Sequence, residues 1–148
     1  MKPSRRLGTS EHLWLRMGQL AANNFVMVAQ LKGHICEVTL KQSLQAIVES
    51  QVMLRSRVLF TKKKRDLSIE ESLDVDLRIL ARKDDSQWQL VAEDEMNEMI
   101  PVDHFPLWRF IWLKGESQHE FILTFNHMIA DGRSGVNFFE SLLARMDN

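Results

Sequence analysis

The chain has 148 residues, of which 45% are hydrophobic and 26% are charged, and its formal net charge is -1. These values are typical of one globular domain, so residues 1–148 are expected to form a single domain. The near-zero net charge indicates no general attraction to nucleic acid or to anionic membranes. No apolar run approaches the ~20 residues that span a bilayer, and no apolar segment follows the basic N-terminus as in a signal peptide.

The sequence contains one cysteine, Cys36, which excludes an internal disulfide framework and is typical of a cytoplasmic protein. A nucleophilic role for this thiol is disfavoured because no activating partner is in view. A metal site formed by His127 and Asp131 is disfavoured, because no third ligand lies nearby and because His104 and His119 show no ligand spacing. We therefore expect a cytoplasmic chain without a metal or a bound cofactor.

Helix and strand patterns alternate in the first half of the chain. The spacing predicts a helix over Ser10–Ala22, a buried strand over Phe25–Leu31, a helix over Thr39–Met53 and a strand over Arg55–Phe60. The buried helix faces are predicted to contain Leu13, Trp14, Met17 and Leu20, and then Leu40, Leu44, Ile47 and Val48. A capping box of Thr39 and Gln42 is predicted at the start of the second helix.

The second half shows the same mixture. Patterns predict a strand over Asp74–Leu80, a helix over Ser86–Met99, a strand over Leu107–Leu113 and a helix over Ser134–Arg145. The inner faces of these helices are predicted to contain Trp88, Val91, Ala92 and Met99, and then Phe138, Phe139, Leu142 and Leu143. Ser86 and Gln89 suggest a second capping box. Because the alternation is not strict, we predict an α+β fold, an open mixed sheet with packed helices.

The most informative segment runs from Phe121 to Gly132. Alternating apolar residues predict a strand that pairs in a hairpin with the preceding one and ends just before His127. A histidine between a buried strand and a loop can exchange a proton near neutral pH, although a lone histidine there is more often structural. Asp131 could hold the loop through an ion pair, and Gly132 could adopt a backbone conformation that other residues avoid.

This segment resembles the H-H-x-x-x-D-G motif of the chloramphenicol-acetyltransferase-like acyltransferases. That superfamily includes condensation domains of peptide synthetases, alcohol acetyltransferases and polyketide-associated acyltransferases. His127 matches the second, catalytic histidine of the motif, and Asp131 and Gly132 match its aspartate and glycine. Asn126 stands in place of the first histidine.

Three further segments resemble family signatures in the family's order. They are Arg6-Leu7-Gly8 with Glu11, then Leu54–Val58, and then Pro101–Asp103 with Pro106–Arg109. The leading arginine and histidine of the second signature are Ser50 and Gln51 here. The resemblance covers nearly the whole chain and favours the single-chain acetyltransferases. Because family enzymes are more than twice this length, the chain matches their N-terminal half, as a truncation or as a natural half-length protein.

The resemblance implies an intact enzyme that moves an acyl group from an acyl-CoA or acyl-carrier-protein thioester to an alcohol or amine. His127 would be the general base, and Asn126 would help position it or a water. Asp131 would orient the loop by pairing with Arg55, and Gly132 would permit the turn. One wall of the substrate tunnel is absent, so the isolated chain is expected to be inactive and to need a complementary C-terminal half or to self-associate.

Two other classes of function remain open. The chain could be a non-catalytic binding or assembly half-domain that pairs with another chain, or a small-ligand carrier that uses the apolar face near Trp108. The basic run Lys62–Arg65 could meet a phosphate of coenzyme A, but a solvated turn is favoured.

The apolar residues near the histidine also have two interpretations. The stripe of Trp108, Phe110 and Trp112 could line an acyl tunnel, but core or subunit packing is favoured. Met128 and Ile129 could face a substrate. Trp108–Trp112 and the helix with Phe138 and Phe139 are the expected sticky face of a half-domain.

Overall fold

The computed structural model describes residues 2–18 and 23–147, and its architecture is α+β, as the sequence predicts. The helices are α1 (Thr9–Gly18), α2 (Glu37–Ser50), α3 (Gln87–Asn97) and α4 (Gly132–Met146), with a short 3-10 helix η1 (Val52–Arg55). The strands are β1 (Ser4–Arg6), β2 (Asn24–Lys32), β3 (Ser56–Phe60), β4 (Arg65–Ile69), β5 (Leu77–Ala81), β6 (Trp108–Lys114) and β7 (Gln118–Asn126). Among the described residues, no helix is long and apolar enough to cross a membrane.

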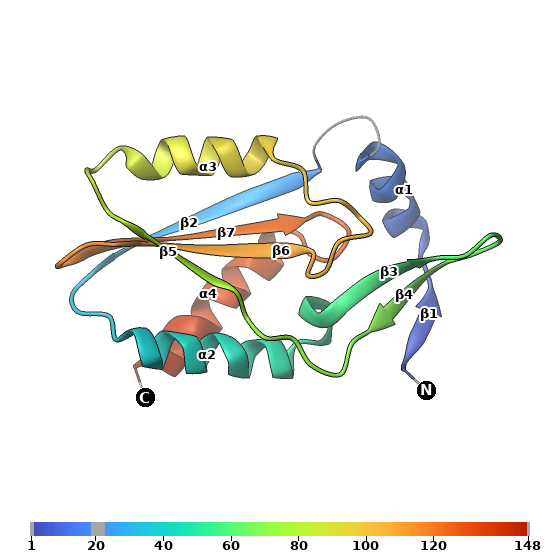
Figure 1. Ribbon diagram of the computed structural model, residues 1–148, viewed down its shortest axis with the longest axis horizontal. Coiled ribbons are helices and arrows are strands. Elements are labelled where there is room, and N and C mark those ends of the chain that lie inside the picture. Colours follow the sequence, from blue (N-terminus) through green and yellow to red (C-terminus); the bar gives the residue numbers. More distant parts are fainter. Residues whose placement is uncertain (1, 19–22, 148) are drawn as a thin grey trace.

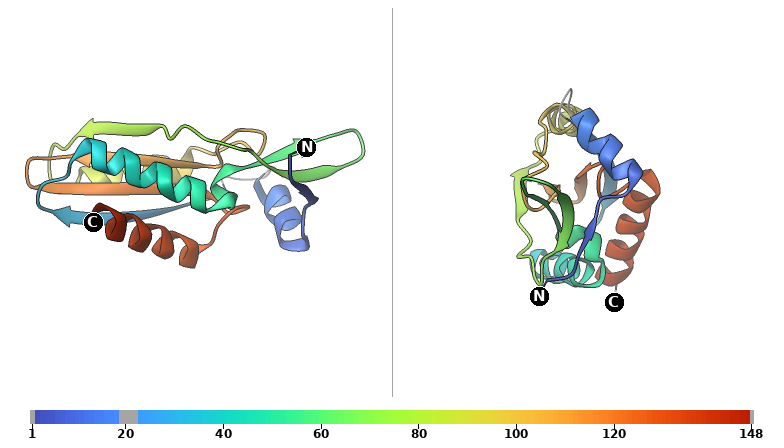
Figure 2. Two further views of the ribbon diagram at one scale, coloured as in Figure 1. Left: turned by 90° about the horizontal axis from the view of Figure 1, so that it is seen from below. Right: turned by 90° about the vertical axis from the view of Figure 1, so that its right-hand side faces the viewer.

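The strands form two open sheets. The larger has the order β2-β7-β6-β5, in which β5 is parallel to β6 and the other neighbours are antiparallel. The smaller sheet is antiparallel, with the order β1-β4-β3. Figure 1 shows α3 on one face of the larger sheet, with α2 and α4 on the other. The views in Figure 2 confirm that α2 and α4 lie side by side and that α1 lies at the end of the molecule beside the smaller sheet.

The central strands β6 and β7 are buried on both faces, and this arrangement separates two cores. Trp108, Phe110 and Trp112 of β6 are at most 4% exposed and belong to the larger core, which α2 and α4 cover. The intervening Ile111 and Leu113 belong to a smaller core that also contains residues of α3. The interpretation of the aromatic stripe as core is therefore confirmed. Strands buried on both faces favour apolar residues, which β6 has at five of its seven positions. β7 also buries polar side chains, and these are hydrogen-bonded: His119, Glu120, Thr124 and Asn126.

The expected sticky face is wrong. Phe138 of α4 is fully buried and Phe139 is 8% exposed, so both complete the larger core with the aromatic stripe of β6. The large apolar side chains that remain exposed lie elsewhere. They include Leu13, Met17, Val52, Leu59, Phe60, Leu90, Met96 and Met99.

The basic segment forms an exposed turn between β3 and β4. Lys62, Lys63 and Lys64 are exposed, and the Thr61 backbone N–H donates to the Lys64 carbonyl at 2.9 Å. The prediction of a solvated turn is confirmed. The strands β1 and β4 were not predicted, because both are short and rich in charged or polar residues.

Helix starts differ from the two predicted capping boxes. The helix α2 begins at Glu37, and its N-cap residue Cys36 makes no side-chain cap bond. At α3, Asp84 rather than Ser86 supplies the acceptor, because its Oδ1 receives the backbone N–H groups of Ser86 and Gln87 at 2.8 Å. The Ser86 hydroxyl also donates to Asp84 Oδ1, at 2.8 Å, so it binds the carboxylate and makes no cap bond of its own.

The predicted inner face is correct for α2, whose four predicted residues are fully buried. It is wrong for α1, where Leu13 is 56% and Met17 is 45% exposed while Leu15 is fully buried. Leu20, the last residue of that predicted stripe, lies outside the described residues. Met99 was assigned to the inner face of α3, but it follows the end of that helix and is 44% exposed.

We predict that Gly115→Ala destabilises the hairpin of β6 and β7, whose turn contains Gly115. A Cβ at Gly115 would lie 2.2 Å from the Gln118 carbonyl oxygen, whereas a Cβ at Gly132 would meet nothing within 4 Å. Forcing a backbone shift of this kind costs roughly 1–3 kcal/mol, so urea denaturation should show a loss of that size. Gly132→Ala is the matched control and should change the free energy of unfolding by less than about 0.5 kcal/mol. Equal stability of the two variants would contradict this account.

Candidate active site

The candidate site lies where β7 leaves the sheet. Strand β7 is held between β2 and β6 along its length, and its last residue, Asn126, pairs with Asn24 of β2. His127 follows directly, and its backbone N–H donates to the Asn23 carbonyl at 3.0 Å. The histidine therefore stands on a rigid buried strand, which limits the movement of its Cα.

Asn126 is 1% exposed, and its side chain fastens the loop that bears His127. Its Nδ2 donates to the Ile100 carbonyl at 3.1 Å, and its Oδ1 accepts from the Met128 backbone N–H at 3.0 Å. The Ile129 N–H also donates to the Asn126 carbonyl at 3.1 Å, which closes a tight turn with His127 near its tip. Asn126 thus positions the His127 backbone through the loop.

Aromatic rings cover the imidazole of His127 on more than one side. The indole of Trp14 in α1 is stacked on it, with ring centroids 4.4 Å apart and an interplanar angle of 10°. The ring of Phe25 in β2 lies with its centroid 4.6 Å away at an angle of 40°. The His127 side chain is only part-buried. Some of its surface therefore remains open to solvent.

This environment favours the neutral form of His127. Burial lowers the pKa of His127 below its usual value of 6.5, while the Asp131 charge and the Ala130 backbone oppose that shift. A neutral imidazole has one nitrogen free to accept a proton. The group is therefore in the form that a general base needs at pH 7.

Asp131 is not buried and does not pair with Arg55, so that prediction is wrong. Asp131 is the exposed N-cap of α4, and its Oδ1 accepts from the Ser134 backbone N–H at 2.9 Å and from the Ser134 hydroxyl at 3.0 Å. These bonds lower the pKa of Asp131. Asp131 still orients the loop, because it fixes the point where the loop becomes helix.

Arg55 has other partners. Its guanidinium donates to backbone carbonyls of α2 and of the segment after β4, at Val48 (3.1 Å), Glu49 (3.4 Å), Glu70 (2.7 Å) and Glu71 (3.0 Å). An arginine near the end of a helix commonly satisfies the last carbonyls in this way. Its donors are used within the scaffold, which explains why it does not reach Asp131.

Two other expectations about the loop are corrected by the structure. Gly132 has no positive φ and no neighbour close to where a Cβ would be, so its backbone does not require glycine. Met128 is 4% and Ile129 is 7% exposed, and both belong to the larger core rather than facing a substrate.

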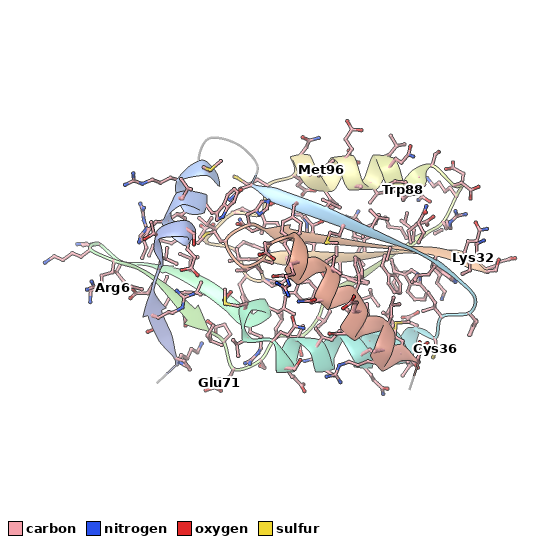
Figure 3. All side chains as sticks on the ribbon, turned by 180° about the vertical axis from the view of Figure 1, so that it is seen from behind. Arg6, Lys32, Cys36, Glu71, Trp88 and Met96 are labelled. Atoms are coloured by element: carbon pink, nitrogen blue, oxygen red, sulfur yellow. The ribbon has the colours of Figure 1, made fainter. Side chains whose placement is uncertain are left out.

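Cys36 lies far from the histidine. Cys36 follows the end of β2 at Lys32. His127 follows Asn126, which pairs with Asn24 at the other end of β2. Eight residue steps along β2 separate these two ends by roughly 26 Å. Figure 3 shows Cys36 near Lys32 and Arg6 at the opposite end of the molecule. Within residues 2–18 and 23–147, no group of three histidine, cysteine, aspartate or glutamate side chains could hold a metal ion.

The buried histidine His119 is bonded entirely within the scaffold. Its Nδ1 accepts from Trp112 Nε1 at 3.2 Å and from the Gly115 N–H at 3.3 Å, and its Nε2 lies 3.0 Å from the Gly33 carbonyl. Every polar atom of this ring is therefore satisfied by the scaffold.

A family model of the condensation domain matches residues 17–145. The chain belongs to the condensation-domain family. The described fold agrees with the N-terminal lobe of solved condensation domains, and the chain spans about one third of their length. Among curated proteins, no significant match was found.

Solved structures of condensation domains share this fold at low identity. A variant of the starter condensation domain of rhizomide synthetase gives a TM-score of 0.85 at 15% identity, over 95% of this chain and 36% of that one. The condensation domain of the monacolin K polyketide synthase gives 0.83 at 13%, over 95% and 33%. The X-domain from teicoplanin biosynthesis gives 0.86 at 17%, over 99% and 33%.

The sequence patterns did not identify the aromatic partners of His127. Trp14 was assigned to a helix stripe and Phe25 to a buried strand, and both assignments explained these rings as core. More than a hundred residues separate Trp14 from His127, so no local spacing connects them. The long-range pairing of β2 with β7 would have been the necessary signal.

We predict that Asn126→Ala destabilises the condensation-domain chain and loosens the histidine loop. The change leaves the Ile100 carbonyl and the Met128 N–H without their buried partner, which costs roughly 1–3 kcal/mol. Urea denaturation should show this loss, and amide exchange should be faster at Met128. Asn137→Ala, at an exposed position of α4, is the control. Protection of Met128 that is unchanged in Asn126→Ala would refute the fastening role.

Proposed function

We propose that this chain is the N-terminal half of a condensation-type acyltransferase with His127 as the general base. The observation that carries the proposal is a neutral, partly exposed imidazole held at the end of a buried strand by loop and ring contacts. Family membership supports the reaction class. A homologous starter condensation domain has been crystallised with C8-CoA, which supports a thioester as the acyl donor.

In this proposal a free nitrogen of His127 accepts the proton of an alcohol or amine as its oxygen or nitrogen attacks the thioester carbonyl. The new C–O or C–N bond forms, the C–S bond breaks, and the departing thiolate takes a proton back from the imidazolium. The charge balance closes without a metal or a redox step. A positioned base of this kind typically contributes ~10²–10⁴-fold in rate.

Each neighbouring side chain has a supporting role in the proposed reaction. Asn126 holds the loop, Asp131 caps the helix after it, and the weak negative field of Asp131 favours the imidazolium that forms during the reaction. Arg55 stabilises the scaffold under the loop. None of these residues touches the reacting atoms in this account.

The second candidate is a non-catalytic assembly half-domain that pairs with another chain. Asn126 favours it, because the amide that stands in place of the first motif histidine is fully used by the scaffold. The two candidates share a need for a complementary surface. They differ in whether His127 matters once that surface is covered.

An apolar hollow beside α1 offers a surface for the complementary half. An open hollow of about 490 Å³ adjoins α1 and the 99–103 segment, and it is lined by Leu15, Gly18, Phe60, Met99, Pro101, Val102 and Asp103. Phe60 is 46% and Met99 is 44% exposed there, so apolar area is open to water. We propose that the rest of the condensation domain covers this hollow.

We predict that the chain self-associates through the same hollow when no complementary half is present. Sedimentation should show a concentration-dependent dimer or larger species, and Phe60→Ser should weaken it by removing exposed apolar surface. Leu90→Ser, at a 66% exposed position of α3, is the matched control and should not change association. A monomer at all concentrations would contradict this proposal.

We predict that His127→Ala removes most acyl transfer from a parent protein that contains both halves, or from this chain mixed with a complementary half. The measurement is release of free coenzyme A thiol across a panel of acyl donors and acceptors. The chain alone should show little or no turnover, because one half cannot hold both substrates at attack distance. His12→Ala, at an exposed histidine of α1, is the control and should keep the activity.

The pH profile provides an independent check. Since burial lowers the pKa of His127 from its usual 6.5, the neutral imidazole predominates at pH 7, and the midpoint of its protonation lies on the acid side of pH 6.5. Acyl transfer should therefore be lost on the acid side below that pH and should be flat near neutrality. Full activity of His127→Ala in the parent would falsify the catalytic assignment and would leave the assembly half-domain as the explanation.

A further inference from the structure

The helix α1 has an attachment that the condensation-type chemistry does not explain. Its residues Leu13 and Met17 face solvent, so the helix is not held by a wide apolar face. Three specific contacts fasten it instead. They are the Arg5–Glu11 ion pair at its start, a bond from Asn23 at its middle, and the stacking of Trp14 on His127.

The start of α1 is fixed by the segment that resembles the family's opening signature. Glu11 accepts from the Gly8 backbone N–H at 2.6 Å and from both terminal nitrogens of Arg5 at 2.5 and 2.8 Å. A glutamate that reaches back to the N-cap N–H defines the first turn of a helix. Trp14 lies three residues after Glu11, on the same side of the helix. This cluster therefore sets the direction in which the indole points.

Asn23 connects the same helix to the histidine. Its Nδ2 donates to the Trp14 carbonyl at 3.0 Å, and its own carbonyl accepts the His127 backbone N–H at 3.0 Å. Asn23 is 6% exposed, so this bridge is shielded from water. The backbones of Trp14 and His127 are thus held at a fixed separation by one residue between them.

From this geometry we infer that Trp14 is a positioning residue for His127, which sets the plane of the imidazole and covers one of its faces. The indole covers one face of the imidazole, and Phe25 lies beside it. Rotation of the imidazole about its Cβ–Cγ bond would therefore break the ring contact with Trp14 (centroids 4.4 Å apart) or with Phe25 (4.6 Å). The reaction consequences rest on the proposed function, but the positioning itself does not.

The covering of His127 by Trp14 also affects the charge state of the imidazole. The charged group that acts on His127 is Asp131 at the start of α4, while α1 and β2 present the uncharged rings of Trp14 and Phe25. Removing the indole admits water to the imidazole face and leaves Asp131 in place. Both conditions favour the imidazolium, so the pKa of His127 should rise toward or above 6.5.

The test is an NMR titration of the His127 ring signals in the 148-residue chain, which needs no activity. In the unchanged chain we expect cross-relaxation between the Trp14 and His127 ring protons and imidazole signals displaced by the indole ring current. Trp14→Leu should abolish that displacement and raise the titration midpoint, and Trp14→Phe should preserve part of both. Trp88→Leu, on α3 at the other face of the sheet (Figure 3), should change neither.

The outcomes separate the two proposals. An absence of Trp14–His127 cross-relaxation in the unchanged chain overturns the positioning role even if Trp14→Leu fails to fold, and so does a folded Trp14→Leu with unchanged ring signals and midpoint. In an assembled acyltransferase, Trp14→Leu should lower kcat by up to about 10²-fold with little change in KM, as expected for a misplaced base. If His127→Ala leaves transfer intact, the proposed function fails while the NMR result still decides the positioning.

Discussion

The buried carboxamide of Asn126 joins parts of the molecule that are distant in sequence at the end of β7. It receives the Met128 N–H, donates to the Ile100 carbonyl, and sits opposite Asn24 in the β2–β7 ladder. A buried amide of this kind is costly unless every bond is made, so the loop, the segment before β6 and the sheet must form together. The location of His127, the start of α4 and the stacking of α1 all follow from that junction.

Local patterns predicted the elements of the core well. The face of α2, the hairpin of β6 and β7, and the aromatic stripe of β6 depend on periodic burial, which the sequence records directly. The short strands β1 and β4 have no such period: β1 is exposed along its length, and β4 buries only the adjacent Leu67 and Ser68. They are held by pairing in the order β1-β4-β3. The role of Asp84 at the start of α3 was missed because its carboxylate accepts the Ser86 hydroxyl as well as the Ser86 and Gln87 N–H groups, which leaves Ser86 as a donor and not as the cap acceptor.

The site was only partly predictable, for a related reason. His127 was placed correctly at a strand end, since the apolar run before it is unmistakable. The pairing of Asp131 with Arg55 was wrong because a motif match fixes residue identity but not the direction of a side chain. Arg55 is satisfied by four carbonyls of the scaffold, and Asp131 by the first turn of α4. Trp14, Phe25 and Asn23 belong to the site only through tertiary contacts.

The β2–β7 ladder also has a kinetic consequence. It pairs Asn24 with Asn126, so the strand that begins the sheet must wait for a partner about a hundred residues further along the chain. During synthesis β2 therefore leaves the ribosome long before its neighbour exists, with apolar residues along a nine-residue strand. Such a high contact order slows folding and exposes an unpaired edge. The edge of β2 that pairs with β7 therefore stays open until residues 118–126 have been synthesised.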